Sequence, residues 1–140
     1  MASFVKINNF VQDLGRGVHN LNSNTLKIML TNSAPNAATH AVKADLTEIS
    51  AGNGYSAGGA TVASTAYSQT SGTGNLTGTD PVITASGGSI GPFRYAVLYN
   101  DTPTSPADPL IGYWDYGSSI TLADTESLTV DLATNIMSVT

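Results

Sequence analysis

Apolar and polar residues alternate along much of this chain, which is the pattern of β-strands that bury one face in a core. In the segment 25–31, every second residue from Leu26 onward is leucine or isoleucine. The segment 126–132 repeats this arrangement with aliphatic residues from Leu128 onward. Weaker alternation predicts further strands at 60–68, 74–78, 81–86, 110–116, 118–123 and 135–140.

The strongest strand pattern lies at 93–100 and is apolar on both sides. Its odd-numbered positions are expected to share one face of a sheet: Phe93, Tyr95, Val97 and Tyr99. Ala96 and Leu98 keep the opposite face apolar, and such a two-sided strand is typical of the centre of a sheet. The glycines and proline of 87–92 are expected to break the chain before this strand, and the three prolines of 101–109 predict a loop after it.

A helical period occurs only near the start of the chain. Within 5–21, apolar residues recur at spacings of three and four, which favours an amphipathic helix. Gly15 and Gly17 weaken its second half, since each costs up to about 1 kcal/mol relative to alanine. We therefore expect a short helix over 5–15 and a turn at 20–24.

The order of these elements predicts an all-β fold. About eight short strands, separated by turns every eight to twelve residues, are typical of an antiparallel β-sandwich. A chain of 140 residues fits one domain, 1–140, with the short helix at 5–15. Between the strands, 45–50 is either a short strand or a helical turn, and Asn53–Gly54 predicts a tight turn within the glycine-rich loop 51–59.

Charge is scarce and unevenly distributed. Charged residues make up 11% of the chain, less than half of the usual ~25%. Residues 1–94 contain five basic and four acidic residues, whereas 95–140 contain six acidic residues and no lysine or arginine, which gives +1 and −6 and a total of −5. An acidic, aromatic, strand-rich region is a poor partner for nucleic acid or an anionic membrane, and it suits a surface that docks on another protein.

Targeting and redox signals are absent from the sequence. No apolar run approaches the ~20 residues of a membrane span, and the N-terminal residues lack the pattern of a signal peptide, so we expect a soluble protein that is made and used without secretion. The chain has no cysteine, which excludes disulfides and thiolate metal sites.

The residues that carry chemistry do not form a recognisable catalytic or metal-binding pattern. His19 and His40 have no partner at metal-ligand spacing and are expected to be surface or capping residues. Asp101, Asp108 and Asp115 offer carboxylates for glycoside hydrolysis or calcium, but solubilising loop acids are the favoured interpretation. No Gly-x-Ser-x-Gly elbow and no phosphate-binding lysine after the glycines occur. We predict no catalytic, cofactor or metal residues and no enzyme activity.

Four residues are candidates for a protein interface: Arg94, Tyr113, Trp114 and Tyr116. Alternation places Trp114 and Tyr116 on one face of their strand and Tyr113 on the other. Core packing is the favoured interpretation of Trp114, with a protein contact or a sugar-stacking platform as the alternatives. Arg94 is expected to pair with Asp115 at a partly buried position or, alternatively, to contact a partner.

Several stretches of the sequence resemble a known family. They are Thr25-Leu-Lys-Ile-Met-Leu-Thr-Asn32, Leu46-Thr-Glu-Ile-Ser-Ala-Gly-Asn-Gly-Tyr55, Gly87-Gly-Ser-Ile-Gly-Pro-Phe-Arg-Tyr-Ala-Val-Leu-Tyr-Asn-Asp101 and Leu110-Ile-Gly-Tyr-Trp-Asp-Tyr-Gly117. Together they resemble small structural proteins of tailed phages and prophages, in particular head cement (decoration) proteins such as that of a Bordetella phage. The similarity runs over nearly the whole chain and involves no catalytic motif.

The resemblance implies a jelly-roll-like β-sandwich on the outer surface of an icosahedral capsid, assembled in the host cytoplasm. Its partners would be neighbouring major capsid subunits, with a homodimer as the binding unit and no cofactor. Two other functions stay open at this point. One is a carbohydrate- or receptor-binding module that uses Tyr113, Trp114 and Tyr116, and the other is a different head or tail component of the virion.

Overall fold

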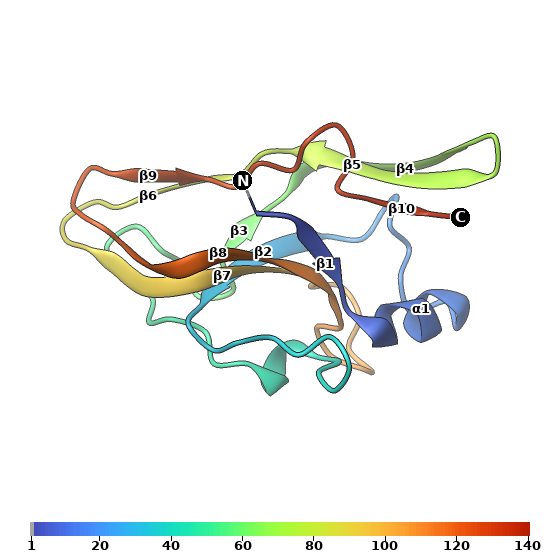
Figure 1. Cartoon of the computed structure of the whole chain (residues 1–140), viewed down its shortest axis with the longest axis horizontal. Helices are drawn as coiled ribbons and strands as arrows, with labels where there is room; N and C mark the ends of the chain where they lie inside the picture. The colour runs from blue at the N-terminus through green and yellow to red at the C-terminus, as the bar shows by residue number, and fades with distance from the viewer. Residues whose placement is uncertain (1) are drawn as a thin grey trace.

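The structure, a computed structural model, describes residues 2–140, and its central feature is a five-stranded antiparallel sheet (Figure 1). In spatial order the strands are β1 (Phe4–Lys6), β8 (Leu110–Leu122), β7 (Ile90–Asn100), β2 (Leu26–Thr31) and β3 (Ala60–Thr61). The strand predicted to be central, β7, is the middle one, so this prediction is confirmed.

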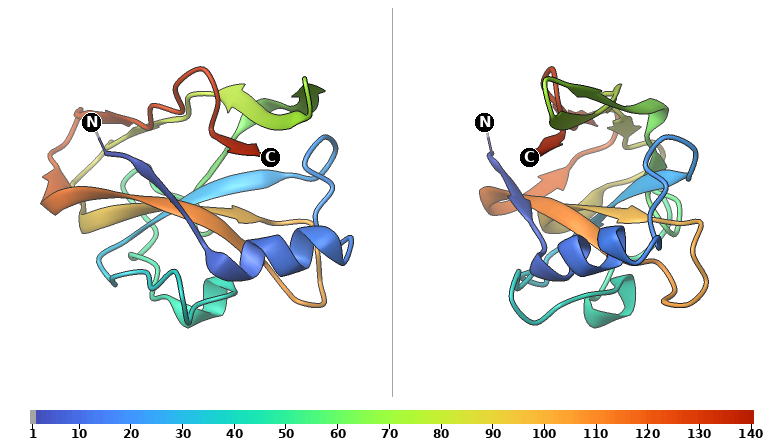
Figure 2. Two further views of the ribbon diagram at one scale, coloured as in Figure 1. Left: turned by 45° about the vertical axis from the view of Figure 1, so that its right-hand side comes forward. Right: turned by 90° about the vertical axis from the view of Figure 1, so that its right-hand side faces the viewer.

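A second layer of strands packs over one face of this sheet (Figures 1 and 2). It contains a ladder of β10 (Met137–Val139), β5 (Thr73–Thr79) and β4 (Ala63–Thr70), and a pair of β6 (Val82–Thr84) and β9 (Ser127–Thr129). The two ladders are joined where Val130 N–H donates to the Pro81 carbonyl at 3.0 Å and Leu132 N–H donates to Asp80 Oδ1 at 2.9 Å. The upper layer is therefore one ribbon that is interrupted at Asp80–Pro81.

Helix α1 (Asn8–Gly15) begins three residues later than predicted. The predicted start at residue 5 is wrong because β1 pairs with β8 there, and sheet pairing prevails over the helical period. Phe10 is buried in the core, whereas Val11 is 55% exposed, so only part of the apolar stripe packs. The predicted turn at 20–24 is confirmed.

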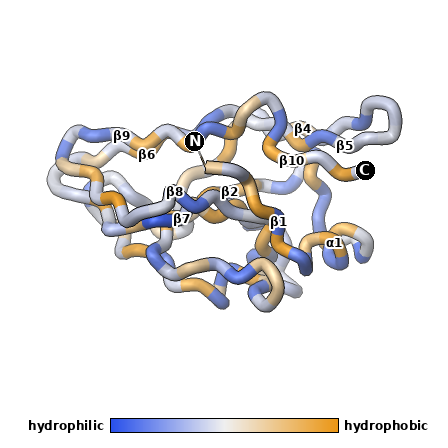
Figure 3. Tube along the Cα trace, viewed as in Figure 1, coloured by the Kyte–Doolittle hydropathy of each residue, from blue (hydrophilic) through white to orange (hydrophobic). Residues whose placement is uncertain are grey.

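Two hydrophobic cores lie on opposite faces of the five-stranded sheet. The main core fills the space between the layers, and its fully buried members include Phe10, Leu26, Ile28, Leu30, Leu76, Phe93, Leu98 and Ile111. The lower core consists of Ile7, Met29, Leu46, Tyr95, Val97, Tyr99 and Leu110. No strand of the upper layer covers it; the segment 32–59 runs beneath it instead (Figure 1). Hydrophobic residues, coloured orange in Figure 3, accordingly occur both in the five-stranded sheet and in the upper layer of strands.

The predicted fold class is confirmed. The chain is 47% strand and 8% helix, with antiparallel sheets and one short N-terminal helix. The jelly-roll arrangement is not confirmed. A jelly roll divides eight strands between two sheets, whereas here five strands form one sheet and the upper layer is divided into ladders of three and two.

Two predictions about β7 need correction. The strand begins at Ile90, so Gly91 and Pro92 lie inside it and do not break it, although Gly87 and Gly88 do form a bend before the strand, as expected. Phe93 also packs in the main core while Tyr95 packs in the lower core, although a regular strand would place both on one face. The register shifts between these two residues, and such a β-bulge reverses the direction of the side chains that follow.

Smaller differences concern three other segments. The predicted strands 110–116 and 118–123 form one strand, β8, in which Gly117 (φ +85°) lies at the predicted break. The segment 45–50, for which the sequence allows a short strand or a helical turn, forms neither in full. It follows a 3₁₀ turn, η1 (Lys43–Asp45), and makes a single β-bridge between Glu48 and Thr31.

Candidate protein-contact surface

The structure separates the four predicted interface residues into two pairs. Trp114 and Tyr116 point into the main core, as the alternation predicts, while Tyr113 lies on the opposite face of β8. Trp114 is 5% exposed and packs edge-on against Phe4, with ring centroids 5.0 Å apart. Core packing, the favoured interpretation of Trp114, is confirmed. The rings of Tyr113, Trp114 and Tyr116 do not form one platform, which removes the geometric basis of the sugar-stacking alternative.

Arg94 forms the predicted ion pair with Asp115. Its Nε donates to Asp115 Oδ1 at 2.8 Å and its Nη2 donates to Oδ2 at 3.1 Å, in the two-point geometry that guanidinium groups favour. Gly117 N–H also donates to Asp115 Oδ1, at 2.8 Å. These contacts lower the pKa of the Asp115 carboxyl, with Arg94 as the larger cause, and they raise the pKa of Arg94.

The same guanidinium lies over an aromatic ring. Arg94 Cζ is 5.4 Å from the centroid of Tyr95, and the Tyr95 ring meets Tyr113 edge-on at 6.3 Å. Val5, directly opposite Tyr113 in the register, is 38% exposed. We call Val5, Arg94, Tyr95, Tyr113 and Asp115 the aromatic face. Because both side chains of the ion pair are more than a third exposed, solvent screens the pair, and its main effect is to fix the position of the guanidinium.

The aromatic face has the composition of a protein-binding hot spot. Tyrosine and arginine are over-represented among residues that dominate binding energy, and both occur here on rigid strands. Arg94 uses two donor groups for Asp115, and its other N–H groups have no hydrogen-bond partner within residues 2–140. They are free to donate to a partner's carbonyl or carboxylate oxygen.

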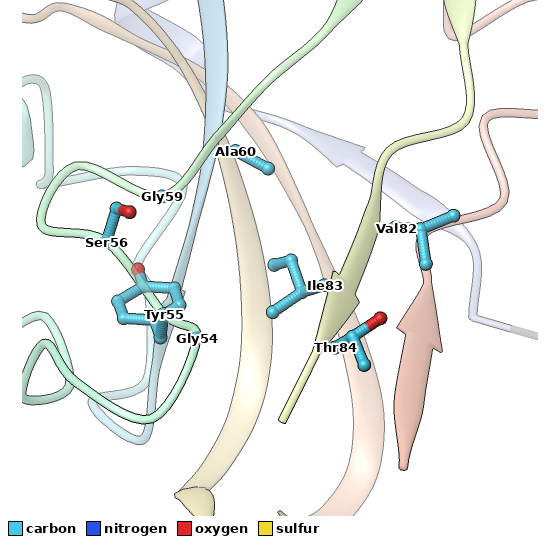
Figure 4. Close-up of a pocket in the computed structure, with 8 residues that line it drawn as sticks. All are labelled: Gly54, Tyr55, Ser56, Gly59, Ala60, Val82, Ile83 and Thr84. Atoms are coloured by element: carbon cyan, nitrogen blue, oxygen red, sulfur yellow. The ribbon is translucent and has the colours of Figure 1, made fainter. Parts of the chain in front are cut away.

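A second feature is a hollow of about 130 Å³ beside the glycine-rich loop (Figure 4). It is lined by Gly54, Tyr55, Ser56, Gly59, Ala60, Val82, Ile83 and Thr84. Tyr55 accepts a hydrogen bond from Leu30 N–H at 2.9 Å through its hydroxyl, and burial raises the pKa of that hydroxyl. The lining contains no carboxylate, histidine or lysine, so the hollow offers no group that exchanges protons near neutral pH.

Close backbone packing explains why this loop is rich in glycine. A Cβ at Gly59, where φ is +85°, would lie 2.0 Å from the carbonyl oxygen of Ile28. The predicted tight turn at Asn53–Gly54 is confirmed by positive φ at both residues and by paired hydrogen bonds between Gly52 and Tyr55 at 2.8 and 3.0 Å.

The remaining candidate groups are dispersed. Asp115 pairs with Arg94. Asp101, which follows the other end of β7, places its Oδ2 3.4 Å from Lys27 Nζ. Asp108 lies near Asp101, and burial, followed by the charge of Asp101, raises the pKa of Asp108. Within residues 2–140, no three His, Cys, Asp or Glu side chains are grouped so that they could hold a metal ion.

The two histidines differ. His40 accepts a hydrogen bond from Asn36 N–H at 3.1 Å through Nδ1, which is the capping role that was expected. His19 was also expected at the surface or as a cap, and this is wrong, because the side chain is only 6% exposed and packs between Phe10 and Asn100.

Three members of the aromatic face were not predicted as contact residues. Asp115 was predicted only as the partner of Arg94. Val5 was assigned to the helix, and the short β1 carries no signal that would reveal its pairing with Tyr113. Tyr95 was assigned to a core face without regard to the arginine beside it. Tyr95 directly follows Arg94, which is the only basic residue after Lys43. This combination is the signal that could have identified Tyr95 as part of a contact surface.

Comparison of the chain with protein-family models, curated proteins and solved structures found no match. Among the described residues, no helix has the length and apolar character that crossing a membrane requires. The aromatic face and the fold are therefore the observations on which a function must rest, together with the sequence resemblance.

Proposed function

We propose that the protein is a structural virion component that binds the outside of an icosahedral phage capsid and clamps adjacent major capsid subunits. The observation that carries this proposal is the aromatic face, in which an ion pair with Asp115 holds the guanidinium of Arg94 over Tyr95. The resemblance of the sequence to head cement proteins supports it, as does the antiparallel β-sandwich with its low content of charge.

Such a clamp stabilises the shell by mass action. A protein that binds the assembled shell but not dissociated subunits adds RT ln(1 + [L]/Kd) for each site, about 2.7 kcal/mol when its concentration is 100 times Kd. Packaged DNA presses outward on the capsid, and a clamp across a subunit junction raises the free energy of opening that junction. No chemical step is needed for this function.

We propose a homodimer as the binding unit. Two linked copies that contact two neighbouring capsomers convert the second contact into an intramolecular event, so that each single contact can be weak. The acidic segment 95–140 fits a position outside the shell, where the protein does not meet the packaged DNA. Sedimentation of the purified protein measures its oligomeric state directly, and a monomer at all accessible concentrations would contradict the homodimer.

The decisive experiment adds the protein back to heads that lack it. We expect wild-type protein to raise the temperature and the osmotic shock at which heads release DNA. Arg94→Ala is expected to bind heads at least tenfold more weakly while its thermal unfolding stays close to that of the wild type. Arg16→Ala is the matched control, because Arg16 lies outside the aromatic face and is exposed. Equal rupture thresholds with and without the protein would refute the stabilising role.

Location in the particle separates this proposal from the nearest alternative. A density map of intact virions should show the chain on the outer capsid surface, across subunit junctions, with the aromatic face turned toward the shell. Density in the tail or at the head–tail connector would instead support a different virion component.

A further inference from the structure

A buried polar network joins the end of β7 to the connection between α1 and β2. Asn100 is fully buried and donates from Nδ2 to Asn24 Oδ1 at 2.9 Å, and the same Nδ2 lies 3.0 Å from His19 Nδ1. Thr102 N–H donates to Asn100 Oδ1 at 3.1 Å, and Asn20 N–H donates to Asn24 Oδ1 at 2.9 Å. The network is thus tied at both ends to backbone N–H groups, which can only donate.

These backbone donors fix the protonation state of the histidine. Thr102 N–H requires the oxygen of the Asn100 amide on its side, so the Asn100 NH₂ group must face His19. An NH₂ group has no lone pair to offer, and Nδ1 of His19 must therefore be the acceptor. The imidazole is neutral, with its proton on Nε2.

The surroundings of the ring also disfavour a positive charge. His19 Nε2 is buried without a hydrogen-bond partner in the described chain, and the ring of Phe10 packs 5.0 Å away. Asp13 of α1 is the charged group that acts on His19, but its Oδ2 is engaged by Asn9 Nδ2 at 3.0 Å. Burial lowers the pKa of His19, and the charge of Asp13 opposes this with a smaller effect.

We propose that His19 is an acid-sensitive anchor for the connection 16–25 between α1 and β2. Protonation of Nδ1 places an N–H group against the Asn100 NH₂ group, where two donors face each other. Rotation of the Asn100 amide does not relieve the conflict, because it would turn that amide's NH₂ group toward Thr102 N–H and its oxygen toward Asn24 Oδ1. The connection therefore separates from β7, which uncovers the buried side chains of Leu21 and Phe10.

The direction of the pH effect follows from linkage. The folded state binds a proton at His19 less readily than the unfolded state, whose histidine has a pKa of about 6.5. The stabilising contribution is fully present above that value and is lost as pH falls through the lower pKa of the folded state. The connection 16–25 should therefore open more often as pH falls over the same range.

Nuclear magnetic resonance provides the primary test, since the chain has only two histidines. We expect the His19 ring to titrate below the ordinary histidine pKa of about 6.5 and to show the Nε2–H tautomer above its midpoint. The protection of the Val18, Asn20 and Asn24 amides, measured relative to the intrinsic exchange rate at each pH, should fall at least tenfold as His19 becomes protonated, while protection in β2 stays unchanged. Titration of His19 at or above about pH 6.5, or amide protection that does not follow it, would overturn the proposal.

A pair of variants provides the second test. His19→Gln offers a neutral acceptor oxygen to Asn100, so the loss of amide protection in 16–25 between about pH 7 and 5 should disappear. His40→Gln is the matched control and should retain this loss of protection. The same loss in His19→Gln and wild type would assign the pH effect to carboxylates, including Asp108, and would contradict the anchor. If His19→Gln does not fold, the wild-type titration alone decides.

Discussion

The two faces of the five-stranded sheet are stabilised in different ways. The main core is almost entirely aliphatic and aromatic and lies between two layers of strands. The lower core is covered by a loop segment, and one of its two buried tyrosines has a polar partner, since Tyr99 donates its hydroxyl hydrogen to the Gly58 carbonyl. Gly58 N–H donates in turn to the carboxylate of Glu48, at 2.7 and 2.8 Å.

This difference assigns separate tasks to the two faces. Burial of apolar surface in the main core is non-directional and supports the whole fold. Directional hydrogen bonds below the sheet hold one loop in one conformation. Beside it, Val5, Arg94 and Asp115 of the aromatic face stay partly exposed, while Tyr95 is buried beneath the guanidinium. Substitutions in the main core should therefore reduce global stability, whereas substitutions below the sheet should act locally or on binding.

The largest expected effect is in the main core. Leu98→Ala removes a fully buried side chain from the central strand and should reduce the free energy of unfolding by about 3–5 kcal/mol. Denaturant unfolding measures this loss. Val11→Ala is the control, because Val11 is mostly exposed and should cost less than about 1 kcal/mol. Equal losses in the two variants would mean that the main core does not dominate stability.

A smaller effect is expected where the glycine-rich loop contacts β2. Gly59→Ala introduces a Cβ 2.0 Å from a backbone oxygen, and we expect a loss of about 2–4 kcal/mol. Gly72→Ala shares a positive φ of +83° but meets no atom within 4 Å, so it should lose only about 1 kcal/mol. The difference between the two unfolding free energies isolates the steric contact. Equal losses in the two variants would mean that the glycine-rich loop moves away from β2 without cost.

The smallest expected effect concerns pH. The pKa of Asp108 is raised in the folded state, so the contribution of this carboxyl to stability should fall as pH rises through that pKa, because the folded state resists ionisation. Asp108→Asn removes this dependence and should become slightly more stable than the wild type above the raised pKa. Unfolding curves of both proteins at several pH values test the sign, which would be wrong if the variant lost stability relative to the wild type as pH rose.

Alternation predicted the strands well because burial of one face imposes a period of two on the sequence. The central position of β7, the orientation of Trp114 and the pair of Arg94 and Asp115 all follow from such local patterns. The bulge between Phe93 and Tyr95 was not predictable, since an extra residue in one strand depends on the length of its partner.

The contact surface and the histidine were harder to predict for the same reason. Val5 joins the aromatic face only because β1 pairs with β8, a contact between residues more than a hundred positions apart. His19 is buried because Asn100 lies 81 positions away at the end of another strand. Long-range pairing of short segments leaves little trace in a single sequence.

The position of the aromatic face within the sheet has a mechanical consequence. Tyr95 and Asp115 are direct partners near the middle of β7 and β8, the two longest strands. Tension applied there along the strands is shared by many interstrand bonds that must yield together, whereas a pull at the sheet margin would open them one after another. A load-bearing contact at this point would resist being torn away better than the same side chains placed on β1.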